Sequence, residues 1–361
     1  MDYQSSLNLL SSQSKFHINL GLERMEKLAL YFSNPQNKLQ FMTPKERYTE
    51  WAYHQENLPI YLTPWWMDAV CAGKEWDVLL CEDKEGAILG AMPYLLRKRA
   101  WYKYIIMPQM TQTGGIWIDP SITADKWQTA EVCRHLKEQL DGMELAYYYQ
   151  HFVPNSLCVE PMKALGFKVR ERVTYRVDNL SNLDELIASF SKNKRRQLQK
   201  ALSLHTESSM DGEQFYRFHT HCMKVRGKNI SYPREFLLVL EKKAKRLLQC
   251  RFLSICNADG QTYAAAFLVW DKNYLYYLLP AMDNTYNDSG AGALLALEAM
   301  KLAREKHVRF DFEGSMNKGI ARHYKQFGST PTPYYSVEKY YKPLFRILIW
   351  IQKLREWKMN R

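Results

Sequence analysis

Residues 250–280 read CRFLSICNADGQTYAAAFLVWDKNYLYYLLP, a pattern of three apolar runs separated by turn residues. An apolar run ends at an acidic-glycine turn, a second run returns with three consecutive alanines, and an aromatic run ends at proline. Short runs rich in β-branched and aromatic residues, separated by turn residues, predict β-strands. The stretch therefore predicts a three-stranded antiparallel meander.

The same pattern occurs earlier in the chain, at residues 76–108, with Gly90 and Ala91 at the position of the alanines. Each copy is followed by a helix-patterned segment, a strand, a short segment ending in Gly and a final strand. These are 126–140, 143–149, 163–166 and 173–177 in the first copy, and 291–306, 308–312, 325–328 and 334–337 in the second. Recurrence in one order indicates an internal duplication. We expect an α/β (α+β) fold of two tandem domains, each a mixed, mostly antiparallel central sheet flanked by helices.

Turn residues and composition predict the domain boundaries. Residues 1–41 are polar and weakly patterned, so we expect a disordered or loosely structured extension. Thr43, Pro44 and Glu46 predict a capped helix start at the beginning of the first domain. A polar turn near residue 179 separates the domains. The predicted parts are the first domain at 42–178, the second at 179–341, opening with a basic helix at 183–204, and a basic amphipathic helix at 342–361.

The composition excludes several classes of protein. No apolar run approaches the ~18 residues of a membrane-spanning helix, and no export signal is recognisable. Seven cysteines without a C-x-x-C pair favour reduced thiols over a disulfide framework or a zinc site. We therefore expect a cytoplasmic protein without a metal. The net charge of +12 predicts a surface that attracts nucleic acid, nucleotide phosphates or anionic lipid.

The segment NDSGAGALL at residues 287–295 joins the third strand of the second copy to a helix. Glycines let backbone N–H groups approach a ligand, and a helix start adds partial positive charge. The pattern predicts a phosphate-binding loop, although a helix entered through glycine without a ligand is the alternative. The candidate cofactor-binding residues are Asn287, Gly290, Ala291, Gly292 and Ala293. The equivalent residues 110–115 of the first copy lead into a strand, so a cofactor is expected in the second copy.

The segment RFDFEGS at residues 309–315 carries the candidate base. Its phenylalanines alternate with Asp311 and Glu313, as in a strand with one face in a core. Glu313 falls at the strand end, where its carboxylate can reach a cleft, and burial would raise its pKa towards that of a general base. The alternative is that Asp311 or Glu313 pairs with a nearby arginine.

The segment IARHYKQFG at residues 320–328 supplies two further candidates. Lys325 near a reacting carbonyl would stabilise developing negative charge, and Tyr324 would give a proton to a leaving group. A solvated basic turn is the alternative. Contact with substrate is expected for Trp66, Tyr276, Asp311 and Ser315, with core packing as the alternative for Trp66.

Together, residues 289–295, 310–315 and 324–328 resemble the GNAT acyl-CoA N-acyltransferase superfamily. More narrowly, they resemble its tandem-domain branch, which includes Fem-type peptidoglycan-bridge aminoacyltransferases and bacterial acetyltransferase-like proteins. Residues 191–201 are similar to the helix that opens the second domain in that branch. Asn287 stands where single-domain GNAT enzymes usually carry Gln or Arg.

The resemblance implies direct acyl transfer without a metal, in which a deprotonated amine attacks a thioester or an aminoacyl ester. It implies that Gly290 and Gly292 lie beside phosphates. It further implies that Glu313 is the base, that Lys325 steadies the carbonyl oxygen and that Tyr324 assists the leaving group.

Three functions remain open at this point. The main hypothesis is N-acylation of a small-molecule or cell-envelope precursor amine, with acyl-CoA or acetyl-CoA as donor. The close alternative is aminoacyl transfer from tRNA to a peptidoglycan precursor. The third is a catalytically silent module that binds RNA or a membrane surface. Residues 342–361 support it, because a basic amphipathic helix can lie peripherally at the inner face of a membrane, although docking of that helix on the domains is the alternative.

Overall fold

The computed structural model describes residues 42–71, 76–314, 316–348 and 351, so the predicted N-terminal extension lies outside the described residues. The chain divides into two units, residues 1–51 and 52–361. In the first unit, helix α3 (Pro44–Tyr53) begins as predicted. The Glu46 backbone N–H donates to Thr43 Oγ1 at 3.2 Å, and the Thr43 N–H donates to the Glu46 carboxylate at 2.8 Å.

The second unit contains both predicted copies in the expected order. The first copy comprises β1 (Trp76–Glu82), β2 (Ile88–Arg99), β3 (Tyr102–Ile106), α5 (Lys126–Gly142), β5 (Tyr147–Phe152), α6 (Val159–Ala164) and β6 (Lys168–Val177). The second copy comprises β8 (Cys250–Cys256), β9 (Thr262–Trp270), β10 (Tyr274–Met282), α11 (Ala291–Glu305), β11 (Arg309–Asp311), α12 (Lys318–Lys325) and β12 (Thr330–Tyr340). Both meanders are antiparallel, and β3–β5 and β10–β11 are parallel.

Shorter elements and the helices between the copies complete this unit. They are η1 (Ile60–Leu62), α4 (Pro64–Val70), β4 (Trp117–Ile118), η2 (Pro120–Ile122), α7 (Leu183–Ser189), α8 (Lys192–Lys200), η3 (Ala201–Ser203), β7 (His205–Glu207), α9 (Gly212–Val225), α10 (Arg234–Arg246) and η4 (Asn284–Ser289). The single helix predicted at 183–204 is wrong, because the chain is extended at Phe190. The Ser191 hydroxyl then accepts the Lys194 backbone N–H at 3.3 Å and starts a new helix.

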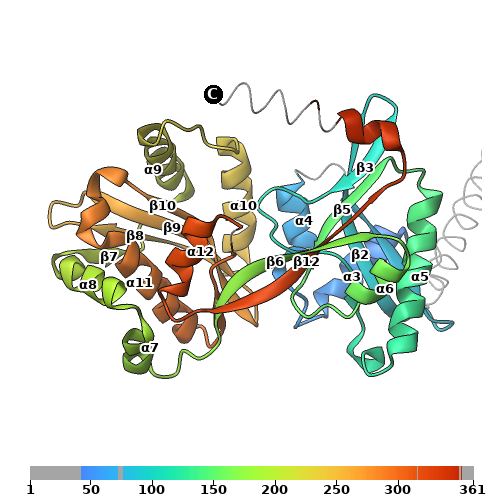
Figure 1. Ribbon diagram of the computed structural model, residues 1–361, viewed down its shortest axis with the longest axis horizontal. Coiled ribbons are helices and arrows are strands. Elements are labelled where there is room, and N and C mark those ends of the chain that lie inside the picture. Colours follow the sequence, from blue (N-terminus) through green and yellow to red (C-terminus); the bar gives the residue numbers. More distant parts are fainter. Residues whose placement is uncertain (1–41, 72–75, 315, 349–350, 352–361) are drawn as a thin grey trace, which may run out of the picture. The chain divides into compact units, whose positions relative to one another are not determined.

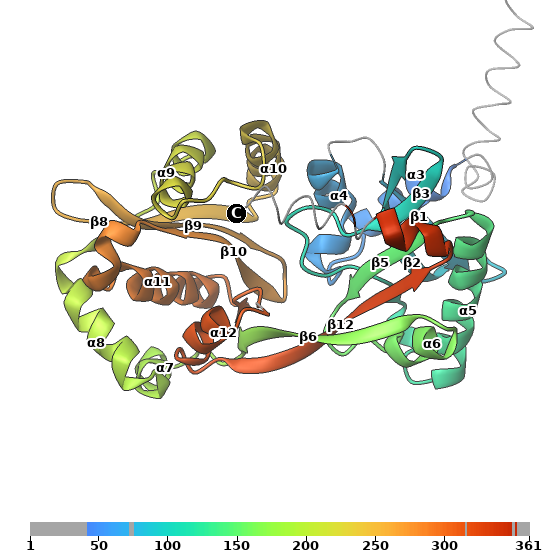
Figure 2. The same cartoon turned by 45° about the horizontal axis from the view of Figure 1, so that its top comes forward.

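The last strand of each copy is exchanged with the other copy. Within the described residues the strands form one sheet in the order β1-β2-β3-β5-β12-β6-β11-β10-β9-β8-β7, with β4 paired to β2. Strand β12 lies between β5 and β6, and β6 lies between β12 and β11. The two strands run side by side from Thr330 opposite Arg176 to Glu338 opposite Lys168 (Figures 1 and 2). The two predicted, mostly antiparallel sheets are therefore present and joined edge to edge.

Alternation along the strands separates a core from a polar face in the second copy. Helix α11 covers one face of β8, β9 and β10, and α9 and α10 lie on the other face (Figure 2). Phe310 and Phe312 point into the core beneath α11. On β6, Val173, Tyr175 and Val177 contribute to the same core. The intervening residues, including Thr174, Arg176 and Asp311, are consequently left for polar contacts.

Candidate functional site

Glu313 follows strand β11 in an unusual backbone conformation. Its φ is +63°, and the φ of the next residue, Gly314, is +59°. A Cβ atom at Gly314 would lie 2.3 Å from the carbonyl oxygen of Val173 on β6, so only glycine fits there. A left-handed conformation at a non-glycine residue costs about 1–3 kcal/mol and persists where surrounding contacts fix it. The chain therefore turns sharply at Glu313, against the strand that the first copy contributes.

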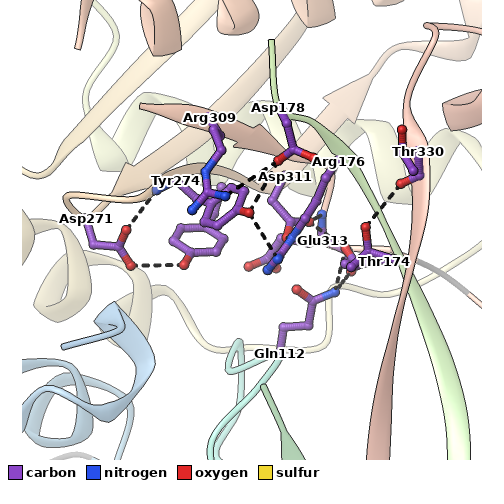
Figure 3. A network of polar contacts seen from close by, with 12 residues as sticks. Gln112, Thr174, Arg176, Asp178, Asp271, Tyr274, Arg309, Asp311, Glu313 and Thr330 are labelled. Carbon is purple, nitrogen blue, oxygen red and sulfur yellow. Dashed lines mark hydrogen bonds and ion pairs between the residues drawn. The ribbon is translucent and has the colours of Figure 1, made fainter. Parts of the chain in front are cut away.

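Both peptide groups of Glu313 are held by hydrogen bonds (Figure 3). Its backbone N–H donates to Asp311 Oδ1 at 2.8 Å. Its backbone carbonyl accepts a hydrogen bond from the side-chain amide of Gln112, a residue of the first copy. The first and second copies thus meet directly at the backbone of the candidate base.

One oxygen of the Glu313 carboxyl group is buried without a partner. The residue as a whole is half-buried, but its Oε1 atom is inaccessible and has no hydrogen-bond partner among the described residues. Burial raises the pKa of this carboxyl well above its ordinary value, because the charged form is disfavoured in a poorly solvated site. A buried polar atom without a partner is costly, and such groups are concentrated at functional sites.

Asp311 organises this site through three contacts. Its side chain is 1% exposed and forms an ion pair with Arg176, with 2.7 Å between Oδ2 and Nε. Its other oxygen accepts hydrogen bonds from the Thr174 hydroxyl and from the Glu313 backbone N–H. Asp311 thus pairs with an arginine, as one of the two interpretations of the sequence expects. The contact of Asp311 with substrate stays a prediction.

Tyr274 lies between two guanidinium groups beside Asp311. The Arg176 group is 4.0 Å from the ring centroid and the Arg309 group is 4.1 Å from it. The Tyr274 hydroxyl accepts from Arg176 at 3.2 Å and donates to Asp178 at 3.3 Å (Figure 3). A cavity of about 280 Å³ opens here, and residues from both copies line it: Gln112, Thr113, Pro154, Arg176, Asp271, Tyr274, Tyr276 and Arg309, among others.

Sequence patterns do not single out Gln112 or Arg176, the two residues that contact the backbone of Glu313 and the carboxylate of Asp311. Arg176 has a signal in retrospect, since KVRERVTYRV at residues 168–177 places Lys168, Arg170, Arg172 and Arg176 on alternate positions of one strand. Gln112 has none, because its partner lies 201 residues further along the chain.

Tyr276 and Trp66, both predicted to contact substrate, lie in different surroundings. Tyr276 lines the 280 Å³ cavity, and its hydroxyl donates to Asp271 at 2.9 Å. Trp66 is fully buried, and its indole N–H donates to the Thr111 hydroxyl at 3.0 Å. Its ring meets that of Tyr61 edge to face at 4.9 Å, so the structure supports the core-packing alternative for Trp66.

Tyr324 is buried next to Glu313, whereas Lys325 is exposed. The Tyr324 ring stacks on Phe312 with 4.4 Å between centroids. Burial raises the pKa of its hydroxyl, and the nearby carboxyls of Glu313 and Asp311 raise it further. Tyr324 therefore stays protonated at neutral pH. Ser315, the other predicted contact, lies outside the described residues.

The predicted cofactor loop forms a helix start that α8 covers. Gly290 has a φ of +82° and precedes α11, whose first N–H, at Ala291, donates to the Ser289 hydroxyl at 3.1 Å. A Cβ atom at Gly290 would lie 2.0 Å from the Gln197 carbonyl oxygen of α8. Of the five candidates, Gly290, Ala291 and Ala293 are buried, Gly292 is half-buried and Asn287 is exposed.

In the described part of the chain, no cluster of three or more His, Cys, Asp or Glu side chains is placed to hold a metal ion. Likewise, none of the described helices has the length and apolar character needed to cross a membrane. Of the predicted C-terminal helix, residues 343–348 are helical, and Phe345 packs against Tyr102 at 5.2 Å between centroids. These residues support the docking alternative, and most of 349–361 lies outside the described residues.

Comparison with known proteins agrees with this architecture. Residues 188–326 match the acetyltransferase (GNAT) domain family. The structure is similar to that of FemX, with a TM-score of 0.63, 16% identity and coverage of 82% of this chain and 96% of that one. It is also similar to a conserved protein of unknown function from Bacteroides thetaiotaomicron VPI-5482, with a TM-score of 0.50, 13% identity and coverage of 75% and 91%.

At these identities the similarities show the fold, and no curated protein matches the chain in sequence. The family match and the fold together support acyl transfer in general. Residues 188–326 are therefore similar to the acetyltransferase (GNAT) domain family, and the fold of the chain is similar to that of FemX.

Proposed function

We propose that this protein is an N-acyltransferase that moves an acyl group from acyl-CoA to an amine beside Glu313. The observation that carries the proposal is the buried Oε1 atom of Glu313, which has no hydrogen-bond partner among the described residues and belongs to a residue held at a fixed turn. The 280 Å³ cavity near it offers a polar recess into which an acceptor would extend. A small-molecule or cell-envelope precursor amine fits this proposal.

The proposed reaction is direct. The amine nitrogen loses a proton to the Glu313 carboxylate and forms a bond to the acyl carbon, after which the carbon–sulfur bond breaks. A carboxylate whose pKa is raised by burial is a stronger base than one in water. The departing thiolate takes a proton from the Tyr324 hydroxyl, and the protons held by Glu313 and missing from Tyr324 are exchanged with solvent.

The experiment that tests this role is transfer of labelled acetyl groups from acetyl-CoA to a panel of amines. General-base catalysis typically contributes about 10²–10⁴-fold, so we expect Glu313→Gln to lower kcat about 100-fold or more. The matched control is Glu171→Gln, which removes an exposed carboxylate on β6 and should leave kcat within about twofold of the wild-type value, as surface substitutions usually do. Equal loss in both variants, or none in E313Q, contradicts the assignment.

A second donor, aminoacyl-tRNA, is favoured by the surroundings of the α11 start. There α8 covers the loop and presents a backbone carbonyl oxygen, which does not attract a pyrophosphate. The outer face of α8 instead carries Lys192, Arg195 and Arg196 around a hollow of about 650 Å³. Within the described residues none of these three forms an ion pair, so the face is available to a polyanion.

Titration calorimetry with acetyl-CoA separates the two donors. Micromolar binding supports the thioester, and its absence together with transfer from charged tRNA supports the second donor. Ribonuclease treatment abolishes the activity only in the second case. A chain that transfers from neither donor would be the silent binding module considered above.

A further inference from the structure

We propose that Gln112, in the first copy, is a positioning residue for Glu313 in the second. The inference rests on the proposed role of Glu313 and adds a second residue to that site. It also gives the first copy a part in the reaction, because Gln112 belongs to residues 110–115. This segment corresponds in the first copy to the cofactor loop of the second.

Glu313 needs an external hold on its backbone. The left-handed conformation of Glu313 is unfavourable for an unconstrained chain, whereas Gly314 adopts its own readily because glycine has no Cβ atom. One hydrogen bond is local: the Glu313 backbone N–H donates to the Asp311 carboxylate at 2.8 Å. The other comes from the Gln112 amide, which donates to the Glu313 carbonyl and lies 3.4 Å from the Thr174 hydroxyl. Thr174 in turn donates to Asp311, so the Gln112 amide contacts both the Glu313 carbonyl and the hydroxyl that bonds to Asp311 (Figure 3).

The amide orientation of Gln112 follows from chemistry. The backbone carbonyl of Glu313 can only accept a hydrogen bond, so the NH₂ end of the Gln112 side chain must face it. Replacing that donor by an acceptor would bring two oxygens together at the turn.

Gln112 is fixed from its own side by His151 and Tyr149. The His151 Nδ1 atom lies 2.8 Å from the backbone carbonyl oxygen of Gln112, and Nε2 lies 2.8 Å from the Tyr149 hydroxyl. A carbonyl only accepts, so Nδ1 carries the proton and Nε2 accepts from Tyr149. Burial lowers the pKa of His151 to about 4, because the imidazolium is disfavoured there, so the ring is neutral at neutral pH.

The loop that carries Gln112 is braced against β5. The Gly114 N–H donates to the His151 carbonyl at 2.7 Å. Gly115 has a φ of +81°, and a Cβ atom there would lie 2.4 Å from the Phe152 ring. A continuous chain of contacts therefore runs from Tyr149 through His151 and Gln112 to Glu313. The contacts of Gly114 and Gly115 with β5 fix the loop that carries Gln112.

The experiment compares Gln112→Ala with Gln109→Ala. Gln109 is in the same loop, and its side chain also donates across to a distant segment, to the Ser231 carbonyl between α9 and α10 at 2.6 Å. With acetyl-CoA or charged tRNA, whichever is the donor, we expect Q112A to lower kcat about tenfold, equivalent to about 1.4 kcal/mol, with KM unchanged. Q109A should leave both values unchanged. A fall in kcat shared by both variants would overturn the positioning role.

A second measurement does not depend on activity. In protein labelled with ¹³C at the glutamate carboxyls, the Glu313 signal is assigned by its loss in E313Q and followed with pH. We expect its pKa in Q112A to move towards the ordinary value for glutamate, and its pKa in Q109A to stay where it is in the wild type. An identical Glu313 titration in wild type and Q112A overturns the inference. Full activity of E313Q, in contrast, overturns the proposed function and leaves this test intact.

Discussion

The Arg176 guanidinium, on the last strand of the first copy, lies 2.7 Å from the carboxylate of Asp311 in the second copy. Both side chains are largely buried, at 13% and 1% exposure. They face each other directly in the pairing of β6 with β11. This ion pair thus joins an exchanged strand to the strand that precedes the candidate base.

Removing the arginine should destabilise the protein strongly. Breaking a buried ion pair by deleting one partner costs about 3–5 kcal/mol, because the remaining charge is left buried. We expect Arg176→Ala to lower the free energy of unfolding by about this amount, measured by urea denaturation. Arg172→Ala is the control, since Arg172 lies on the same strand but bonds to the neutral Tyr334 hydroxyl. Equal midpoints for R176A and wild type would contradict the prediction.

Alanine substitutions at two glycines with similar φ values separate the cost of the left-handed backbone from the cost of a steric clash. Gly290 and Gly260 have φ values of +82° and +76°. A Cβ atom would meet the Gln197 carbonyl at Gly290 and nothing within 4 Å at Gly260. We expect Gly260→Ala to cost about 1–2 kcal/mol from the left-handed conformation alone. Gly290→Ala should cost more, because α8 must also move away from α11. An equal loss in the free energy of unfolding for the two variants would mean that α8 moves away from Gly290 without a measurable cost.

Glu313 should make stability depend on pH. Its pKa is raised in the folded protein, so the folded state holds this proton more tightly than the unfolded state does. This contribution is fully present below the ordinary pKa of glutamate and is lost as the pH rises through the folded-state pKa. We therefore expect Glu313→Gln to be more stable than wild type at pH 8, with the difference shrinking towards pH 4. A constant difference across this range would exclude a raised pKa.

The Tyr324 hydroxyl can be tested apart from its ring. Tyr324→Phe keeps the stacking on Phe312 and removes only the proposed proton donor. We expect the free energy of unfolding to change little and kcat to fall about tenfold, a loss of about 1.4 kcal/mol in transition-state stabilisation. Unchanged turnover would show that the leaving group takes its proton elsewhere.

Lys325 was predicted to steady the reacting carbonyl, and this stays a prediction. The side chain is exposed on α12, one residue after buried Tyr324. If the ammonium reaches the acyl group, Lys325→Ala should lower kcat at least about tenfold. The control is Lys318→Ala at the exposed start of the same helix. Turnover of K325A equal to that of K318A would remove Lys325 from the site.

The sequence predicts the elements of the fold well because their signals are local. The alternation and turns of 250–280 match β8, β9 and β10, and the glycine entry at Gly290 starts α11 as expected. The break at Phe190 was missed, because 183–204 has helical character on both sides and the deciding contact is one hydroxyl cap at Ser191.

The candidate site is less accessible to such reasoning. The position of Glu313 at a strand end follows from local alternation, and the arginine pairing of Asp311 was an explicit alternative. The contact with Gln112 depends on how two segments far apart in sequence pack together, which no local pattern encodes. The strand exchange depends likewise on pairings between the copies, since each final strand looks the same whichever sheet it joins.

Each half of the chain contributes one strand to the sheet of the other half. Strand β12 lies between β5 and β6, and β6 lies between β12 and β11. A chain cleaved in the turn near residue 179 would yield two fragments. The first fragment would lack β12 between β5 and β6, and the second would lack β6 between β12 and β11. In each fragment the strands beside the gap would expose unpaired backbone N–H and C=O groups. Each fragment also carries the strand that fills the gap of the other. Such pieces would behave as a split-protein pair, and the candidate base would be assembled only when they recombine.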